Sequence, residues 1–272
     1  MSSDFKTRTL GRTGLEVGRL GLAASYGAPA GAFEEAFEKG CTYFYYGSGR
    51  RRAGMRQALR NLCDRGARDK LVVAVQTYAR FGLLTEYTVA KTLRSLGIDY
   101  ADILILGWHN RRPSLGLVDQ TMKLREKGLV RFIGLSGHNR KLFPELSKNG
   151  VFDLFHIRYN AAHRGAETES FPFLTGDNRP GLVTYTATRW GQLLKPKMMP
   201  AGEGPLTAAD CYRFVLSNPD VDVCMCGPRD IGEMQMALSA LDLGPFDDDK
   251  MNRVRRIGDH IHSHSKGFFS MG

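Results

Sequence analysis

Residues 41–77 read CTYFYYGSGRRRAGMRQALRNLCDRGARDKLVVAVQT, and they contain the unit from which the fold can be predicted. The apolar and aromatic run Thr42–Tyr46 is typical of a buried strand, and it ends at a glycine ahead of the arginines Arg50–Arg52. Apolar residues then recur at helical spacing over Ala53–Asp64, and a second apolar strand is expected over Leu71–Thr77. A strand, a helix and another strand joined by short loops predict a right-handed parallel unit.

The same alternation continues along the rest of the chain. Further strands are expected at residues 20–23, 101–106, 132–135, 154–158, 181–186 and 221–226. Further helices are expected at residues 32–38, 85–96, 115–127, 141–147, 207–217 and 231–241, with a basic C-terminal helix from Asp247. Glycines between apolar residues at 9–17 predict an N-terminal β-hairpin. Eight strands alternating with helices predict an α/β fold, an eight-stranded parallel (β/α)8 TIM barrel, as a single domain over residues 1–272.

Two long loops are candidate lids over the barrel. Residues 161–180 are rich in charge, glycine and proline, and residues 194–204 carry Lys195 and Lys197. Loops that follow barrel strands gather at the C-terminal rim, where ligands bind in this architecture.

Composition narrows the class of partner. The chain has 272 residues and a formal net charge of +10, with a pI near 9.5, which favours phosphorylated cofactors, acidic substrates or nucleic acid. The positive charge is dispersed and no nucleic-acid-binding module is visible, so nucleic acid is not expected. No run of about 18 apolar residues and no signal-peptide core is present, which predicts a cytoplasmic protein without a membrane span.

The cysteines and histidines do not predict a metal site. Five cysteines, an odd number, fit reduced thiols better than a disulfide framework. Cys224 and Cys226 would share one face of a strand, as core thiols do. The histidines at 260, 262 and 264 fit a polar C-terminal tail.

The loop after the strand Thr42–Tyr46 allows two interpretations. Arg50–Arg52 beside Tyr45 and Tyr46 could hold an anionic ligand and lower the pKa of a phenol by stabilising the phenolate. Alternatively, the arginines form a solvated turn before a helix.

Short segments at the strand ends carry a family resemblance. In order along the chain they are LGRTGLEV (10–17), GIDYADIL (97–104), GLVRFIGLS (128–136), IRYN (157–160) and VTYT (183–186), the last followed by Trp190-Gly191. Together they resemble the aldo-keto reductase superfamily, which comprises NADP(H)-dependent carbonyl reductases built on an eight-stranded barrel. The likeness covers nearly the whole chain.

The catalytic residues that the resemblance implies are not preserved. The family reduces a carbonyl with a tyrosine as proton donor, helped by a lysine, an aspartate and a histidine. Here Tyr45 replaces the aspartate, Gln76 the lysine and Gly107 the histidine, and residues 48–51 lack the tyrosine. Because barrel residues alternate, these three positions should point into the mouth, where Tyr45 is expected to fill the space over Gly107.

Two interpretations of this substituted site stay open. In one, Tyr45 is a relocated acid, with Gln76 or Arg50 stabilising charge and His109 as a second candidate donor. In the other, the catalytic set has been lost and Tyr45 only packs.

The cofactor-binding part of the resemblance is better preserved. Ser136 matches the serine that contacts the nicotinamide amide, with Asn139 nearby, and His156 replaces a glutamine in the same role. Tyr185, followed by Thr186, matches the residue that stacks on the nicotinamide ring. Gly227-Pro228-Arg229 resembles the adenosine phosphate loop, where Arg229 would pair with a 2′-phosphate.

The resemblance implies an NADP(H)-dependent oxidoreductase with a non-standard site, acting on a small carbonyl or anionic substrate. Two alternatives remain: a non-catalytic barrel that binds NADP(H) or another anion, and a barrel enzyme of another class.

Overall fold

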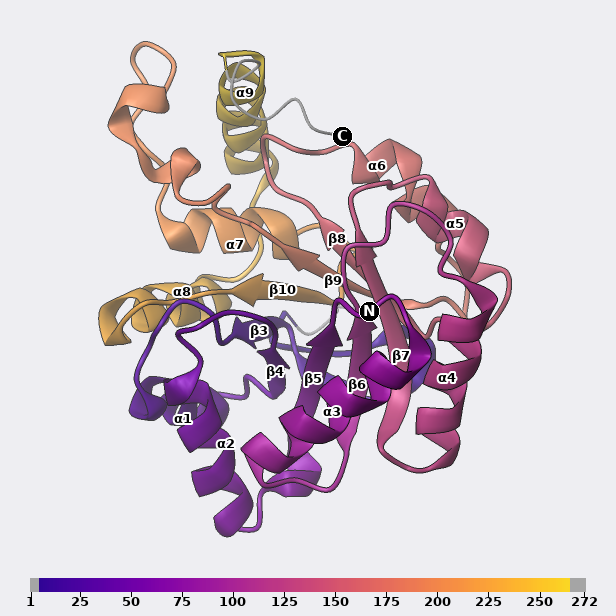
Figure 1. Ribbon diagram of the computed structural model, residues 1–272. Coiled ribbons are helices and arrows are strands. Elements are labelled where there is room, and N and C mark those ends of the chain that lie inside the picture. Colours follow the sequence, from indigo (N-terminus) through magenta and orange to yellow (C-terminus); the bar gives the residue numbers. More distant parts are fainter. Residues whose placement is uncertain (1–4, 265–272) are drawn as a thin grey trace.

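A computed structural model describes residues 5–264 of the chain, in which eight parallel strands form a closed barrel (Figure 1). Around the barrel the strands follow the order β10-β3-β4-β5-β6-β7-β8-β9. Their bounds are β3 (Leu20–Ala23), β4 (Tyr43–Tyr46), β5 (Val72–Thr77), β6 (Ala101–Leu106), β7 (Val130–Gly137), β8 (Leu154–Arg158), β9 (Gly181–Tyr185) and β10 (Val223–Cys226). The predicted barrel is confirmed.

Helices surround the barrel. Their bounds are α1 (Ala30–Glu38), α2 (Ala53–Asp64), α3 (Gly82–Leu96), α4 (Leu115–Glu126), α5 (Leu142–Ser147), α6 (Ala166–Glu169), α7 (Ala208–Leu216), α8 (Ile231–Leu243) and α9 (Asp248–His264). The predicted ends differ from these by up to three residues. The largest difference is at α3, whose first residue, Gly82, packs so tightly on α4 that a Cβ there would lie 2.8 Å from Gln120 Cβ.

The side chains of β4 point alternately into the barrel and out to the helices, and so belong to two different apolar cores. Tyr43 points into the barrel and joins an interior cluster, whereas Phe44 and Tyr46 point outward to the helices. The antiparallel hairpin of β1 (Thr7–Thr9) and β2 (Glu16–Gly18) was predicted correctly. Its residues Leu10 and Val17 belong to the interior cluster, so the hairpin closes the N-terminal end of the barrel.

A buried carboxylate ties the hairpin to the closing strands. Asp222, directly before β10, is fully buried. It accepts hydrogen bonds from Arg179 Nη1 at 2.8 Å and from the Leu182 backbone N–H at 2.8 Å, and Arg8 Nε lies 3.2 Å from its Oδ1. Asp222 therefore holds β1, β9 and β10 together.

The two candidate lids differ in structure. Residues 161–180 contain only α6 and a short 3-10 helix, η3 (Phe171–Phe173), in keeping with the weak helical signal. Residues 194–204 project from the barrel between α7 and α9 (Figure 1) and include η5 (Pro196–Met198). Arg253 of α9 anchors this second loop by donating to Glu203 Oε2 at 2.8 Å.

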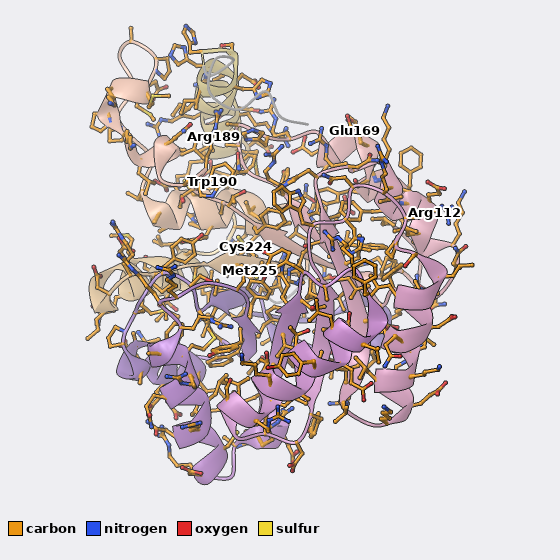
Figure 2. The ribbon with its side chains drawn as sticks, in the orientation of Figure 1. Arg112, Glu169, Arg189, Trp190, Cys224 and Met225 are labelled. Atoms are coloured by element: carbon orange, nitrogen blue, oxygen red, sulfur yellow. The ribbon has the colours of Figure 1, made fainter. Side chains whose placement is uncertain are left out.

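Within residues 5–264 no helix is long and apolar enough to cross a membrane, and no group of three or more His, Cys, Asp or Glu side chains could hold a metal ion. Cys224 and Cys226 lie in the outer core, whereas Met225 between them belongs to the interior cluster, as the strand pattern predicts. Cys224 and Met225 are labelled on β10 in Figure 2.

Candidate active site

A large cavity opens at the C-terminal ends of the strands. Its volume is about 1270 Å³, and its wall runs from the barrel mouth to the loop after β10. Of the sequence-predicted site residues, those on the wall are Tyr45, Gln76, Ser136, His156, Tyr185, Thr186, Gly227, Pro228 and Arg229. Arg50, His109 and Asn139 are not among its lining residues.

Tyr45 lies at the mouth among other phenols. Its ring crosses the loop so closely that a Cβ on Gly47 would lie 2.5 Å from Tyr45 Cε1. Burial raises the pKa of Tyr45 well above its usual value, and Tyr78, Tyr185 and Tyr26 raise it further. A phenol in these surroundings stays protonated at neutral and moderately alkaline pH.

The arginine loop does not lower the pKa of Tyr45, which corrects the sequence-based expectation. Arg50 is exposed. Arg52 lies over the outward Tyr46 ring at 4.5 Å, and its Nη1 donates to Gly47 O at 2.7 Å. The guanidinium is therefore used to shape the turn after β4, not to stabilise a phenolate.

Gln76, and not Tyr45, occupies the space beside Gly107. A Cβ on Gly107 would lie 2.1 Å from Gln76 Nε2, so position 107 has room only for glycine while Gln76 keeps this place. The expectation that Tyr45 fills this space is thus corrected. Gln76 Oε1 is buried without a hydrogen-bond partner, which leaves an acceptor for a ligand.

His109 faces a different cavity. It is 6% exposed and lines a separate space of about 390 Å³ with Arg80 and Trp108. Arg80 Nη1 lies 2.8 Å from His109 Nε2 and also donates to Gly107 O. Burial and the Arg80 charge lower the pKa of His109 to about 4, so the imidazole is neutral near pH 7.

His156 forms the floor of the large cavity. It is 1% exposed, and its Nε2 lies 2.8 Å from Tyr43 Oη inside the barrel. Burial lowers the pKa of His156 to about 3, so the ring is neutral and keeps one N–H donor. The Tyr45 ring is 5.3 Å from it, which links this floor to the mouth.

Ser136 and Tyr185 form one wall, and neighbouring groups fix their positions. Ser136 Oγ accepts the Trp108 backbone N–H at 3.2 Å, and Tyr185 Oη donates to Gly137 O at 3.1 Å. Asn139 lies outside this wall because its Nδ2 donates to Asn110 O at 3.2 Å.

At the far end of the cavity Arg229 already has a carboxylate partner. Its Nε and backbone N–H donate to the two carboxylate oxygens of Glu233 at 2.8 Å each. This pairing lowers the pKa of Glu233. Asp230 caps the same end of α8 by accepting the Glu233 N–H at 2.8 Å.

Several aromatic residues of the cavity were not assigned a role in the site from the sequence. Each follows a barrel strand by a few residues, and that position was the signal available: Tyr26, Tyr78, Trp108 and Trp190. Trp108 is 61% exposed and has a left-handed backbone with φ 57°. Arg80 holds this turn by donating to Trp108 O at 2.7 Å.

Comparison with known proteins shows that the fold of this barrel is similar to that of solved aldo-keto reductases. No protein-family profile matches the chain. Among solved structures, the aldo-keto reductase AKR11C1 from Bacillus halodurans is similar in its apo form, with a TM-score of 0.76, and in its holo form, with a TM-score of 0.78. Each is 19% identical and covers 93% of this chain, and the matches cover 95% and 96% of the apo and holo chains.

A curated protein is similar to part of the sequence. The NADH-specific methylglyoxal reductase of Escherichia coli (strain K12) is 30% identical over 115 residues, which is 37% of this chain and 35% of that protein. The match therefore spans about a third of the length of the curated relative. The resemblance inferred from the sequence is confirmed at the level of fold.

Proposed function

We propose that the chain is an oxidoreductase that uses a reduced nicotinamide dinucleotide to reduce a small carbonyl compound, with a non-standard proton donor. The cavity at the C-terminal rim carries this proposal. At about 1270 Å³ it exceeds the roughly 300 to 1,000 Å³ typical of small-molecule sites, so a dinucleotide and a small substrate fit together. The reductase names of the related proteins support the same reaction class.

The residues on the wall suit a nicotinamide dinucleotide. The Tyr185 ring offers a flat surface for the nicotinamide, while Ser136 and His156 offer donors for its carboxamide. Gly227 and Arg229, before α8, would hold the adenosine end. Once bound, the cofactor supplies hydride to the carbonyl carbon.

Tyr45 is the proposed proton donor. As hydride reaches the carbon, the carbonyl oxygen takes the proton of the Tyr45 hydroxyl, and solvent at the mouth returns a proton to the phenolate. The unpaired Gln76 Oε1 then accepts the hydroxyl hydrogen of the alcohol product.

The direct test mixes the protein with NADPH or NADH and a panel of aldehydes and quinones while cofactor absorbance is followed. Oxidation of the cofactor that depends on both protein and carbonyl supports the proposal. Cofactor binding seen by fluorescence without any oxidation would instead favour a non-catalytic barrel. The raised pKa of Tyr45 favours this second function, because no described cation helps the phenol to ionise.

Replacement of Tyr185 by Ala should weaken cofactor binding by about tenfold, because a stacked ring contributes about 0.5 to 1.5 kcal/mol beyond its buried area. Fluorescence titration measures the dissociation constant. Tyr185→Phe is the matched control, since it keeps the ring and loses only the hydroxyl contacts with Gly137 O and His138 Nδ1. Unchanged affinity in the alanine variant would reject the stacking role.

The finer part of the proposal is that NADPH binds better than NADH, through Arg229. Because Glu233 holds Arg229, a 2′-phosphate must share or displace that carboxylate, so the preference should be modest. Glu233→Gln should enlarge the NADPH to NADH affinity ratio by about tenfold, and Arg229→Ala should remove the preference. Titrating both cofactors on each variant checks this, and equal affinities in the parent protein would contradict it.

A further inference from the structure

The small cavity beside His109, with a volume of about 390 Å³, carries positive charge on its wall. Three of its nine lining residues are arginines, namely Arg80, Arg111 and Arg112. None of the described residues that line it is Asp or Glu. A concave surface that carries one sign of charge concentrates ions of the opposite sign, so this cavity attracts anions.

Arg80 keeps a pair of donors for a ligand. Its Nη1 donates to Gly107 O at 2.9 Å and lies 2.8 Å from His109 Nε2, and its Nη2 donates to Trp108 O at 2.7 Å. Both hydrogens of Nη1 and one hydrogen of Nη2 are thus used, which leaves the Nε–H and the second Nη2–H. These two neighbouring hydrogens form the planar pair that binds two oxygens of an anion.

His109 adds an uncharged donor to the same cavity. Because an arginine can only donate, His109 Nε2 accepts from Arg80, and the neutral ring carries its proton on Nδ1. The residue is 6% exposed, and among residues 5–264 no acceptor lies within hydrogen-bonding distance of Nδ1. This nitrogen is not sealed from solvent, so the Nδ1–H is available to a ligand in the cavity.

The first turn of α4 begins at the wall of the small cavity. Ser114 lines the cavity and is the N-cap of this helix of 12 residues, and its Oγ accepts from the Leu117 N–H at 3.4 Å. The N–H groups of Leu115 and Gly116 have no intrahelical partner, as at the start of any helix. Free N–H groups at a helix N-terminus favour a bound anion.

The loop between β6 and α4 is held in place, so these donors are positioned before a ligand binds. Asn110 Oδ1 accepts the His138 N–H at 2.7 Å. Arg112 Nε donates to Glu145 Oε1 of α5 at 2.8 Å, and Figure 2 shows Arg112 near this helix. Arg111 is exposed and forms no ion pair among residues 5–264. Its charge is therefore free to balance that of a ligand.

We propose that the small cavity binds a phosphate group, either free or carried by a small molecule. Arg80 and Arg111 match the charge of a phosphate dianion, while the Nδ1–H of His109 and the first turn of α4 supply uncharged donors. None of these groups lines the large cavity, so the site is separate from the proposed cofactor contacts. The proposal does not depend on reductase activity.

Trp108 allows binding at this site to be followed directly. It lines the small cavity, and the chain has 2 tryptophans, so Trp190→Phe leaves Trp108 as the sole tryptophan. Titration of this variant with inorganic phosphate should change the Trp108 fluorescence and saturate at millimolar concentration or below. Calorimetry on the parent chain should give the same dissociation constant.

Two arginine variants test the charge contribution. Arg111→Gln should weaken phosphate binding by at least about tenfold, the usual contribution of a charge-assisted contact. Arg256→Gln removes an exposed arginine of α9 and should bind phosphate like the parent. An equal decrease in the two variants would show attraction by net charge alone and would overturn the proposal, as would equal affinity in the parent and Arg111→Gln.

A proline at position 115 tests the contact with α4. Leu115→Pro removes the first N–H of the helix at a position where proline is tolerated, after a Ser114 backbone that is already extended at φ −63° and ψ 149°. It should weaken phosphate binding by about two- to tenfold, the contribution of an uncharged hydrogen bond. Leu115→Ala keeps the N–H and should bind like the parent. Leu115 is 82% exposed, so neither variant disturbs the core.

Two further titrations locate the site and its ligand. Glycerol phosphate that binds at least as tightly as inorganic phosphate indicates a phosphate ester as the ligand, and weaker binding indicates free phosphate. Saturating NADPH should leave phosphate binding unchanged in calorimetry, because the cofactor belongs to the large cavity. Loss of phosphate binding in the presence of NADPH would place the phosphate in that cavity and overturn the proposal. Inorganic phosphate that does not bind the parent chain at millimolar concentration would also overturn it.

Discussion

Tyr45→Phe should lower carbonyl reduction by about 10² to 10⁴ in turnover, the usual contribution of a general acid, with little change in cofactor affinity. The phenylalanine keeps the ring that lies across Gly47 and beside His156, and only the proton donor is lost. Steady-state kinetics and fluorescence titration on the same preparation separate the two effects. Loss of both activity and binding would indicate a packing role, and unchanged turnover would exclude Tyr45 as the donor.

The pH dependence gives a second readout of the same prediction. Reduction requires the protonated phenol, and burial raises the pKa of Tyr45 above its ordinary value of 10.0. The proton is therefore retained as pH rises, and turnover should show no basic limb from this group below about pH 10. Arg50→Gln should leave this profile unchanged, because Arg50 is exposed and does not line the cavity. A basic limb near pH 7 to 8 would contradict the assignment.

Asp222→Ala should lower the free energy of unfolding by about 3 to 5 kcal/mol, because it leaves two arginines near β9 and β10 without their buried carboxylate partner. Arg179 and Arg8 both lose their contact with the carboxylate, and the Leu182 N–H loses its acceptor. Urea unfolding followed by circular dichroism measures the change. Asp242→Ala is the matched control, since Asp242 pairs with Lys6 on the surface and its loss should leave the unfolding midpoint near that of the parent. A decrease in the free energy of unfolding of less than about 1 kcal/mol for Asp222→Ala would show that β1, β9 and β10 are held together mainly by apolar packing.

Most of the fold could be predicted because it depends on local patterns. Apolar runs such as residues 101–106 are buried on both faces, and glycine and charge clusters separate them from amphipathic helices. The helix end at Gly82 could not be predicted, because glycine is disfavoured in helices and is required here by contact with Gln120 of another helix.

The site residues that lie on strands could be predicted, because side chains along a strand point alternately into and out of the barrel. Tyr45 and Gln76 point into the mouth for this reason. After a strand ends, the direction of a side chain depends on the backbone conformation of the loop and on contacts with residues that are distant in the sequence. His109 turns away because Trp108 adopts a left-handed conformation that Arg80, from the preceding loop, holds in place. The pairing of Arg229 with Glu233 has helical i, i+4 spacing and could have been recognised in the sequence.

The contact between Gln76 and position 107 also constrains which sequences are accessible from this one. A histidine introduced at position 107 alone would overlap the amide of residue 76, because even a Cβ there lies 2.1 Å from Nε2. A shorter or redirected side chain at position 76 must therefore precede or accompany any change at 107. The ring of Tyr78 restricts the same position, since its Cε1 would lie 2.7 Å from that Cβ. Introducing a histidine at position 107 therefore requires that residues 76 and 78 both make room for it.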